Sequence, residues 1–193
     1  MTEKTDPKKI LVLLGSPRRK GNSTTLAEGI IKGAETAGAA VEKVYLHGQK
    51  IAPCQACYAC RKPKSRSCAI DDDMQFIYQK LAEADAWVIA SPVYWFTMSA
   101  QTKLFMDRCF ALFNIKKEAL AGKNIAVAMS YADADPFVSG CVNALRTFQD
   151  AFAYVGANIV GMVYGSADKP GEIKSNRALM AEADALGRLL AKS

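Results

Sequence analysis

Residues 10–24, ILVLLGSPRRKGNST, decide the fold that this sequence predicts. The first five are consecutive aliphatic residues, a pattern typical of a strand buried on both faces of a sheet. A polar loop follows between Gly15 and Gly21, and residues 23–37 then carry apolar side chains at helical spacing. A buried strand, a tight loop and an amphipathic helix in this order indicate the first unit of a parallel α/β sheet.

The same alternation of strand and helix continues along the 193 residues. Aliphatic runs predict four more strands, at residues 41–46, 86–90, 125–130 and 159–164. Helical periodicity predicts further helices at residues 74–84, 99–113, 138–152 and 179–190. Right-handed crossovers place such helices on both faces of a sheet, so we expect an α/β fold with a doubly wound, five-stranded parallel sheet in the order 2-1-3-4-5. Half of the residues are hydrophobic and no linker is visible, which predicts a single domain over residues 1–193.

Charge and hydropathy argue against several classes of function. No apolar run approaches the roughly 18 residues that a membrane span needs, so we expect no membrane association. Residues 1–9 are charged and lack an apolar stretch, which predicts no secretory signal and a reducing, cytoplasmic location.

The net charge of +6 includes a basic cluster formed by Arg61, Lys62, Lys64 and Arg66. No helix-turn-helix, zinc-finger or RNA-recognition pattern accompanies this cluster, so we expect no nucleic-acid partner. A solvated loop, an anionic cofactor and a docked acidic electron carrier are the interpretations that remain.

Four of the six cysteines fall within one short segment, residues 51–70, which follows the second predicted strand. Cys54, Cys57 and Cys60 have a three-residue spacing, and Cys68 follows after seven further residues. Thiols at this spacing can wrap around one iron–sulfur cluster, as the Cys-x2-Cys-x2-Cys run of bacterial ferredoxins does. Electron transfer is therefore the first hypothesis for this segment.

Two other interpretations of these cysteines stay open. A structural zinc site draws its thiols from two separated Cys-x2-Cys pairs, which fits three linked cysteines less well. The thiols could also be free, either redox-active or vestigial. A disulfide framework is not expected, because a chain of this size can bury a core without cross-links. Cys109 and Cys141 lie at apolar positions of predicted helices, where we expect small buried side chains.

In doubly wound sheets, ligands bind beyond the carboxyl ends of the strands, which selects three loops of this chain. The first loop, residues 15–24, suits a phosphate group, because Ser16, Ser23 and Thr24 offer hydroxyl donors. Arg18 can add a charge-assisted hydrogen bond, and the following helix adds its free N–H groups. The loop lacks the Gly-Lys-Ser/Thr ending of a Walker loop and the Gly-x-Gly-x-x-Gly dinucleotide pattern. The alternative is that Ser23 only caps the helix.

The second loop, residues 91–98, carries three consecutive aromatic residues just beyond a buried strand. Tyr94, Trp95 and Phe96 could cover a flat ring while backbone groups of residues 93–95 bond to its polar edge. A subunit interface is the alternative use of such aromatics. The third loop, residues 131–135, is less specific, and Tyr131 is its candidate contact with the ring edge.

Three acidic residues, 71–73, precede the predicted helix at residues 74–84. We expect them to cap that helix and to complement its dipole. A magnesium site is the weaker alternative. His47 is the only histidine and is expected in a surface loop, so a histidine-based mechanism has little support.

The motifs of the first and second loops resemble those of the flavodoxin-like NAD(P)H-dependent FMN reductases. The phosphate-loop motif is Gly15-Ser-Pro-Arg18 with Gly21-Asn-Ser-Thr24. The ring-loop motif is Ser91-Pro-Val-Tyr94-Trp95, followed by Lys103, Asp107-Arg108 and Ala121-Gly-Lys123. A further set of residues resembles the motif of the iron–sulfur flavoprotein branch of that family. This set consists of Pro53, the four cysteines from Cys54 to Cys68, and Asp71 to Met74.

The resemblance implies a flavodoxin-like fold with a cysteine-rich insertion after the second strand, and it implies FMN and a 4Fe–4S cluster as cofactors. The FMN phosphate would contact Ser16, Arg18, Asn22, Ser23 and Thr24. The ring would lie against Pro92, Val93, Tyr94 and Trp95, with Ser130, Tyr131 and Ala132 closing the site. The cluster ligands would be Cys54, Cys57, Cys60 and Cys68, and the protein would form a homodimer or homotetramer.

The sequence leaves three functions open. The first is an FMN-dependent oxidoreductase that passes electrons between flavin and the cluster, and in which no side chain need act as acid or base. The second is an NAD(P)H-dependent FMN, quinone or azo reductase without a cluster. The third is a non-catalytic flavin- or zinc-binding module. The electron donor or acceptor would be a small molecule such as NAD(P)H, or a ferredoxin-like carrier.

Overall fold

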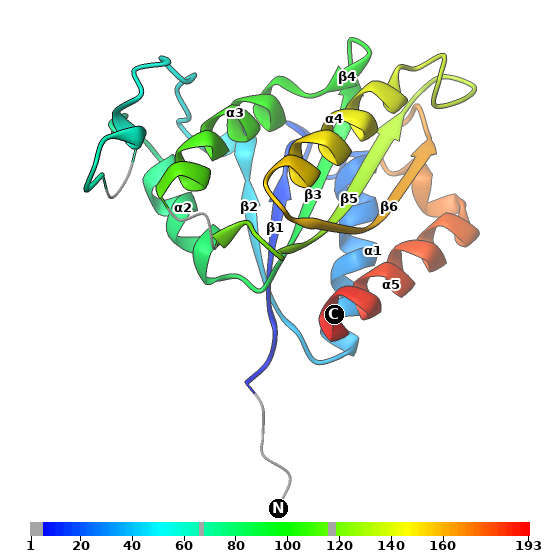
Figure 1. The fold of residues 1–193 in the computed structure, drawn as a ribbon. Helices are drawn as coiled ribbons and strands as arrows, with labels where there is room; N and C mark the ends of the chain where they lie inside the picture. The colour runs from blue at the N-terminus through cyan, green and yellow to red at the C-terminus, as the bar shows by residue number, and fades with distance from the viewer. Residues whose placement is uncertain (1–5, 66–67, 116–118) are drawn as a thin grey trace, which may run out of the picture.

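The computed structural model describes residues 6–65, 68–115 and 119–193, and its strands and helices alternate along the chain (Figure 1). The strands are β1 (Lys9–Leu14), β2 (Ala40–Tyr45), β3 (Ala86–Tyr94), β4 (Thr97–Met98), β5 (Asn124–Tyr131) and β6 (Asn158–Ser166). The helices are α1 (Asn22–Thr36), α2 (Met74–Glu83), α3 (Ala100–Ile115), α4 (Cys141–Tyr154) and α5 (Arg177–Lys192). Short 3₁₀ helices cover Leu46–Gly48, Ala59–Arg61 and Glu172–Ser175. Arg66 of the predicted basic cluster lies outside the described residues.

The five long strands form one parallel sheet in the order β2-β1-β3-β5-β6, which confirms the predicted order. The short strand β4 is an addition to that prediction, because it pairs antiparallel with the end of β3. Residues 91–98, predicted as a loop, therefore form a β-hairpin. The strand β3 continues beyond its predicted end at Ala90 as far as Tyr94.

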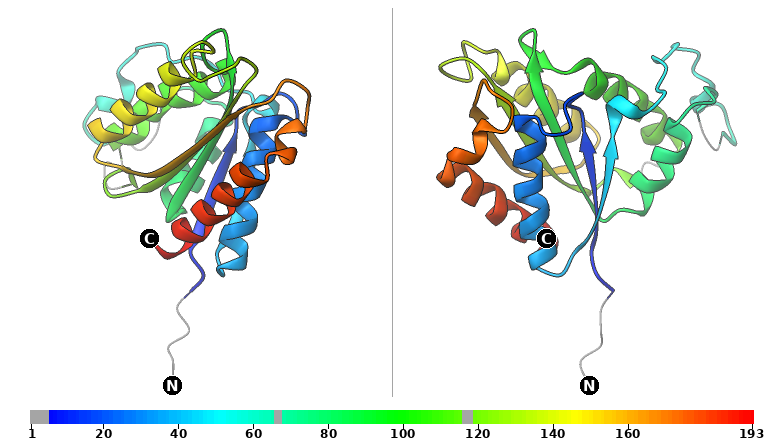
Figure 2. Two further views of the ribbon diagram at one scale, coloured as in Figure 1. Left: turned by 90° about the vertical axis from the view of Figure 1, so that its right-hand side faces the viewer. Right: turned by 180° about the vertical axis from the view of Figure 1, so that it is seen from behind.

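The side chains of β1 alternate between two hydrophobic cores, one on each face of the sheet. Leu11 and Leu13 pack in the core that also contains buried residues of α2, α3 and α4. Ile10, Val12 and Leu14 pack in the core formed with α1 and α5. Figure 2 shows the two groups of helices on opposite sides of the sheet. A strand covered on both faces must be apolar at every position, which explains the uninterrupted aliphatic run of β1.

The two cores differ in the size of the side chains that the central strands supply. Toward α2, α3 and α4 these strands present large residues such as Trp87 and Ile89. Toward α1 and α5 they present small residues such as Ala86, Ala90 and Ala128. Small residues on this face leave room for α1 and α5 to lie close to the sheet and to each other.

The helices α1 and α5 approach so closely that glycine is required at their contact. A Cβ atom at Gly33 would lie 1.9 Å from the carbonyl oxygen of Asp184, and one at Gly187 would lie 1.9 Å from that of Ile30. Glycine inside a helix costs about 1 kcal/mol relative to alanine, so its presence here indicates that close packing outweighs helix propensity.

One predicted helix begins later than its apolar pattern suggested. The helix α4 begins at Cys141, whereas the pattern started at Val138, which is 59% exposed in the structure. Gly140 has a φ of 73°, a left-handed conformation that interrupts the helical path. By contrast, Gly38 ends α1 as predicted, with a φ of 93°.

Among the described residues, no helix has the length and apolar character that crossing a bilayer requires.

We expect Gly33→Ala to lower the free energy of unfolding by roughly 2 kcal/mol, because the added methyl group overpacks the contact between α1 and α5. Urea unfolding followed by circular dichroism measures the change. Gly48→Ala is the control, since nothing lies within 4 Å of a Cβ at that position. An unchanged or higher stability of Gly33→Ala would contradict the close approach of the two helices.

Candidate functional site

The loops that follow β1, β3, β5 and β6 meet at the carboxyl edge of the sheet and surround a cavity of about 160 Å³. The lining residues are Ser16, Arg18, Gly21, Asn22, Pro92, Val93, Tyr94, Ser130, Tyr131, Ala132, Ala167 and Asp168. Most residues predicted to contact a flavin are therefore brought together. Ala167 and Asp168 also line the cavity, although they were not among the predicted flavin contacts. They could have been found from their position directly after the last strand, because the loop after that strand lies at the same edge of the sheet.

The start of α1 forms a cradle with free hydrogen-bond donors. Gly21 is the N-cap and has no side chain to satisfy the first backbone N–H groups, which lack intrahelical acceptors. Ser23 is only 1% exposed, and its Oγ has no hydrogen-bond partner within the described chain. The alternative that Ser23 caps the helix is therefore wrong. An unpaired buried hydroxyl beside free amides at a helix N-terminus suits an anionic group.

The side chain of Asn22 has a different role from the predicted phosphate contact. Its Nδ2 donates to the carbonyl oxygens of Ala167 and Lys169, each at 3.0 Å, and its Oδ1 accepts from the amide of Ile173 at 3.3 Å. These bonds attach the loop after β6 to the phosphate loop. Only the backbone amide of Asn22 remains for a phosphate group.

The other polar side chains of the phosphate loop hold its shape. The Oγ of Ser16 accepts from the amide of Arg18 at 3.1 Å, and the Oγ1 of Thr24 donates to the Arg18 carbonyl at 3.4 Å. A Cβ at Gly21 would lie 2.8 Å from the Oγ of Ser16, so glycine keeps this turn tight.

The hairpin between β3 and β4 turns sharply at two aromatic residues. Trp95 and Phe96 have φ values of 49° and 64°, and two successive left-handed residues are typical of a type I′ hairpin turn. Bulky residues rarely adopt this conformation, which costs of order 1–3 kcal/mol each. The turn is held from α4, because Asn143 Nδ2 donates to the Phe96 carbonyl at 3.1 Å.

The side chains of Tyr94 and Trp95 lie differently with respect to the cavity. Tyr94, a predicted ring contact, lines the cavity. Trp95 is 91% exposed and is not among the lining residues, so the structure does not bring it to the predicted ring contact.

The start of α3 is bonded to the first loop. The Oγ of Ser99 donates to the carbonyl of Gly15 at 2.8 Å and lies 2.9 Å from the Oγ1 of Thr102. A Cβ at Gly15 would lie 1.9 Å from that Oγ1. The phosphate loop and α3 are thus positioned as one unit.

The cysteine segment lies between β2 and α2 and extends beyond the body of the sheet (Figure 1). Cys54 and Cys57 are exposed, whereas Cys60 and Cys68 are partly buried, and all four are free thiols. All four line one small cavity, together with Arg108 and other residues of α3. Within residues 6–65, 68–115 and 119–193, no three His, Cys, Asp or Glu side chains lie close enough together to hold a metal ion.

The thiols of this cavity interact electrostatically. Burial raises the pKa of Cys60, and negative charge on Cys68, Cys54 or Cys57 raises it further. Thiolates are the ligand type of iron–sulfur and zinc sites, in which the metal charge would reverse this repulsion.

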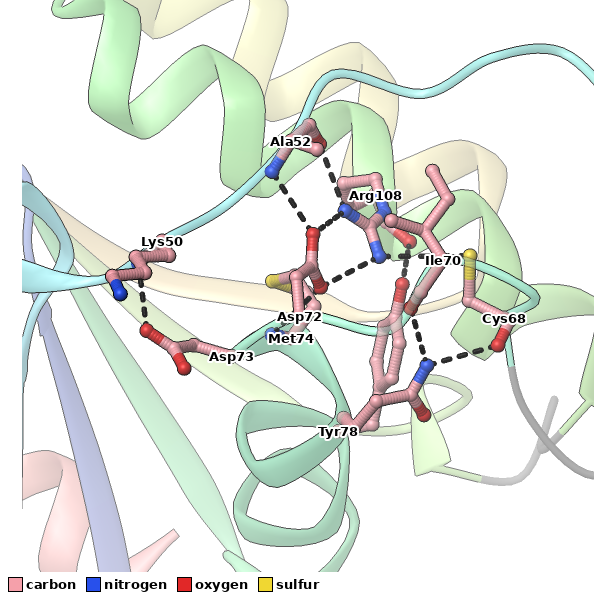
Figure 3. A network of polar contacts seen from close by, with 10 residues as sticks. Lys50, Ala52, Cys68, Ile70, Asp72, Asp73, Met74, Tyr78 and Arg108 are labelled. Atoms are coloured by element: carbon pink, nitrogen blue, oxygen red, sulfur yellow. Dashed lines mark hydrogen bonds and ion pairs between the residues drawn. The ribbon is translucent and has the colours of Figure 1, made fainter.

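A buried ion pair fixes both ends of the cysteine segment (Figure 3). Arg108 of α3 is 1% exposed and bonds the Asp72 carboxylate through two nitrogens, at 2.5 Å and 3.0 Å. At one end of the segment, Asp72 accepts from the Ala52 amide at 2.9 Å and Arg108 donates to the Ala52 carbonyl at 2.8 Å. At the other end, Arg108 Nη2 donates to the Sγ of Cys68 at 3.6 Å.

The acidic residues 71–73 serve this network more than the helix that follows. Asp72 accepts one amide of α2, that of Met74, at 3.1 Å, which agrees in part with the predicted capping. Asp73 stands at the N-cap without a side-chain cap and accepts from the Lys50 amide instead. The oxygens of Asp72 are occupied by Arg108 and backbone donors, so the magnesium alternative finds no support here.

The two charged groups shift each other's pKa. Burial opposes ionisation of Asp72, but hydrogen bonds from Arg108 and from the Ala52 and Met74 amides outweigh it and lower the pKa of that carboxyl group. Burial likewise opposes the charge on Arg108, and the bond to Asp72 outweighs it and raises the pKa of the guanidinium.

Comparison with known proteins relates these features to one family. The family described as NADPH-dependent FMN reductase matches residues 8–171. An iron-sulfur flavoprotein of Methanosarcina thermophila is 37% identical over 122 residues, which span 63% of this chain and 62% of that protein. A protein of Bacillus subtilis (strain 168), named as a candidate NAD(P)H-dependent FMN-containing oxidoreductase, is 28% identical over 93% of this chain and 97% of its own length. The structure of NAD(P)H:quinone oxidoreductase from Methanothermobacter marburgensis superposes with a TM-score of 0.71 at 19% identity, covering 95% and 97% of the two chains. This likeness shows the shared flavodoxin-like α/β fold.

We expect Asp72→Asn to lower the free energy of unfolding by roughly 3 kcal/mol at pH 7, because it leaves the buried charge of Arg108 uncompensated. In the native protein, the stability gained from the lowered pKa of Asp72 is fully present above about pH 5 and is lost progressively as the pH falls below that value. In Asp72→Asn, the free energy of unfolding should lack the part of its pH dependence that comes from the Asp72 carboxyl group. Urea unfolding at pH 7, 4 and 3 measures both effects.

Asp73→Asn is the matched control, since Asp73 bonds one backbone amide and no cation in the described chain. Equal losses for the two variants, with identical acid dependence, would show that the ion pair adds nothing to stability.

Proposed function

The chain belongs to the NADPH-dependent FMN reductase family, and we propose that it is an FMN-dependent oxidoreductase that passes electrons between flavin and a 4Fe–4S cluster. The observation that carries the proposal is that the chain forms two cavities, each lined by residues that suit one of these cofactors. One lies at the carboxyl edge of the sheet, and the other is lined by Cys54, Cys57, Cys60 and Cys68.

The residues around the first cavity fit FMN in chemistry. The free amides at the start of α1 suit the phosphate, and Arg18, which lines the cavity, supplies a positive charge. The unpaired hydroxyl of Ser23 is buried next to the lining residue Asn22 and adds a further donor, although Ser23 itself is not among the lining residues. Pro92, Val93 and Tyr94 offer an apolar surface for a flat ring. Flavin supplies the redox chemistry, while these residues bind the cofactor, orient its ring and exclude water from one side.

The residues around the second cavity fit an iron–sulfur cluster through their donor set. Four thiols surround one space, and both ends of their segment are already attached to the folded body by Asp72 and Arg108. A bound cluster would supply one-electron transfer. The relative from Methanosarcina is named for such a centre, and the matched region spans less than two thirds of that protein.

A cluster-free NAD(P)H-dependent FMN, quinone or azo reductase is the second candidate. Two observations favour it. Cys54 and Cys57 are exposed, and the thiols in the described chain do not converge to metal-binding distance. In this function the cysteine segment would be a surface insertion, and the cavity beside Tyr94 would admit both nicotinamide and the acceptor in turn.

Partners, assembly and compartment are part of the proposal. NAD(P)H or a ferredoxin-like carrier would supply electrons, and the exposed Arg61, Lys62 and Lys64 suit docking of an acidic carrier. A homodimer or homotetramer would cover exposed aromatics such as Phe110 and Tyr154, which line a groove of about 590 Å³ between α3 and α4. Six free thiols suit the reducing cytoplasm.

We predict that Ser23→Ala weakens FMN binding by roughly 10- to 100-fold without destabilising the flavin-free protein. The hydroxyl would bond the charged phosphate, a contact worth roughly 1.5–3 kcal/mol, whereas without flavin it is a buried group with no partner. Fluorescence titration with FMN and urea unfolding of the flavin-free form measure the two effects. Thr25→Ala is the control, because its Oγ1 already donates to the Gly21 carbonyl at 3.0 Å. Loss of stability with unchanged FMN affinity would make Ser23 a purely structural residue.

Anaerobic reconstitution followed by iron, sulfide and FMN analysis tests the cluster. We expect about four irons and four sulfides per FMN, and loss of iron in Cys60→Ser. Cys141→Ala, which alters a buried thiol of the core, should retain the iron. Flavin without iron in the reconstituted native protein would favour the cluster-free reductase.

A further inference from the structure

The geometry points to Arg108 as a positioning residue that sets the reduction potential of the cysteine centre through its bond to Cys68. This inference rests on the proposed cluster, and it concerns a residue of α3 that lies outside the four cysteines. If Arg108 raises the reduction potential of the cysteine centre, then the negative charge of its partner Asp72 should lower that potential.

The contact itself joins a buried cation to a sulfur ligand. The Nη2 of Arg108 donates to the Sγ of Cys68 at 3.6 Å, and Arg108 lines the cavity shared by the four cysteines. The Nε of the same guanidinium is buried and has no hydrogen-bond partner among the described residues. Unpaired buried donors are rare, and this one leaves the guanidinium with a donor still free.

The guanidinium is held rigidly in this position. Asp72 bonds two of its nitrogens, and the Ala52 carbonyl accepts from one of them. The backbone of Arg108 is fixed as well, because the Tyr78 hydroxyl donates to its carbonyl at 2.8 Å. A planar fork can bond a carboxylate and a sulfur at once, which the single ammonium of lysine cannot do in the same geometry.

A fixed donor of this kind changes the energy of adding an electron nearby. Reduction makes a cluster and its thiolates more negative, so an N–H donor and a positive charge stabilise the reduced form and raise the potential. The side chains of Arg108 and Asp72 are 1% and 8% exposed, and little water screens their charges. The negative charge of Asp72 acts in the opposite sense, while its bonds keep Arg108 in place.

A purely structural ion pair would behave differently. Removing either partner would then destabilise the protein or lower the iron content, but it would leave the potential of the remaining clusters unchanged. Shifts of opposite sign from the two partners are therefore the signature that separates the roles.

The experiment is a potentiometric titration of reconstituted protein, with reduced cluster followed by electron paramagnetic resonance and FMN followed by absorbance. We expect Arg108→Met to shift the cluster equilibrium about tenfold toward the oxidised form, which is about 59 mV for one electron. Asp72→Asn should shift it toward the reduced form. The FMN potential serves as an internal reference that should stay unchanged, and Tyr78→Phe is the control, since it removes a bond to the Arg108 backbone and none to sulfur.

A double variant covers the case in which Arg108→Met does not fold. Asp72→Asn with Arg108→Met leaves no buried charge unpaired, and its cluster potential should lie below that of Asp72→Asn alone. Equal potentials in these two variants, or an unchanged potential in Arg108→Met, would overturn the role of Arg108. Native protein that takes up no iron after reconstitution would overturn the proposed cluster together with this inference, whereas iron-loaded variants with native potentials would overturn the inference alone.

Discussion

A parallel sheet cannot be closed by short hairpins, and the arrangement of this protein depends on that constraint. Each long strand must be followed by a crossover that returns the chain to the opposite edge, and the crossovers cover both faces. All chain segments that leave the strands at their carboxyl ends therefore gather on one side. The cavity beside Ser16, Tyr94 and Ala132 lies on that side, where the loops after β1, β3, β5 and β6 meet.

The cysteine segment depends on a contact between residues far apart in the sequence, the ion pair of Asp72 and Arg108. It has few buried side chains of its own, and three of its residues, Ala56, Tyr58 and Lys64, have left-handed backbone conformations. The buried pair of Asp72 and Arg108 compensates by attaching both ends to α3. Such pairs contribute little net stability when compared with apolar residues of similar size. Here the pair holds both ends of the segment whose four cysteines line one cavity.

The strands, their order and the phosphate loop could be predicted because their signals are local: aliphatic runs, helical periodicity and glycines at turns. The role of Arg108 could not, since its partner lies 36 positions away and an arginine within a helix normally indicates a solvated surface. The hairpin was missed because Trp95 and Phe96 occupy turn positions that usually carry asparagine or glycine. Asn22 has the residue type of a phosphate ligand, and only the fold reveals that its amide group is bonded to the loop after β6.

The helix α3 contacts the phosphate loop near its start and the cysteine segment further along, so the spacing between these two contacts matters. Thr102 near its start packs against Gly15 of the phosphate loop, and Arg108 contacts Cys68 six residues later, a rise of about 9 Å. Inserting one residue between them would rotate Arg108 by about 100° and turn it away from both Asp72 and the sulfur. A change in the length of the helix between these contacts would therefore separate the guanidinium from both of its partners, whereas replacing an exposed side chain would leave this register unchanged.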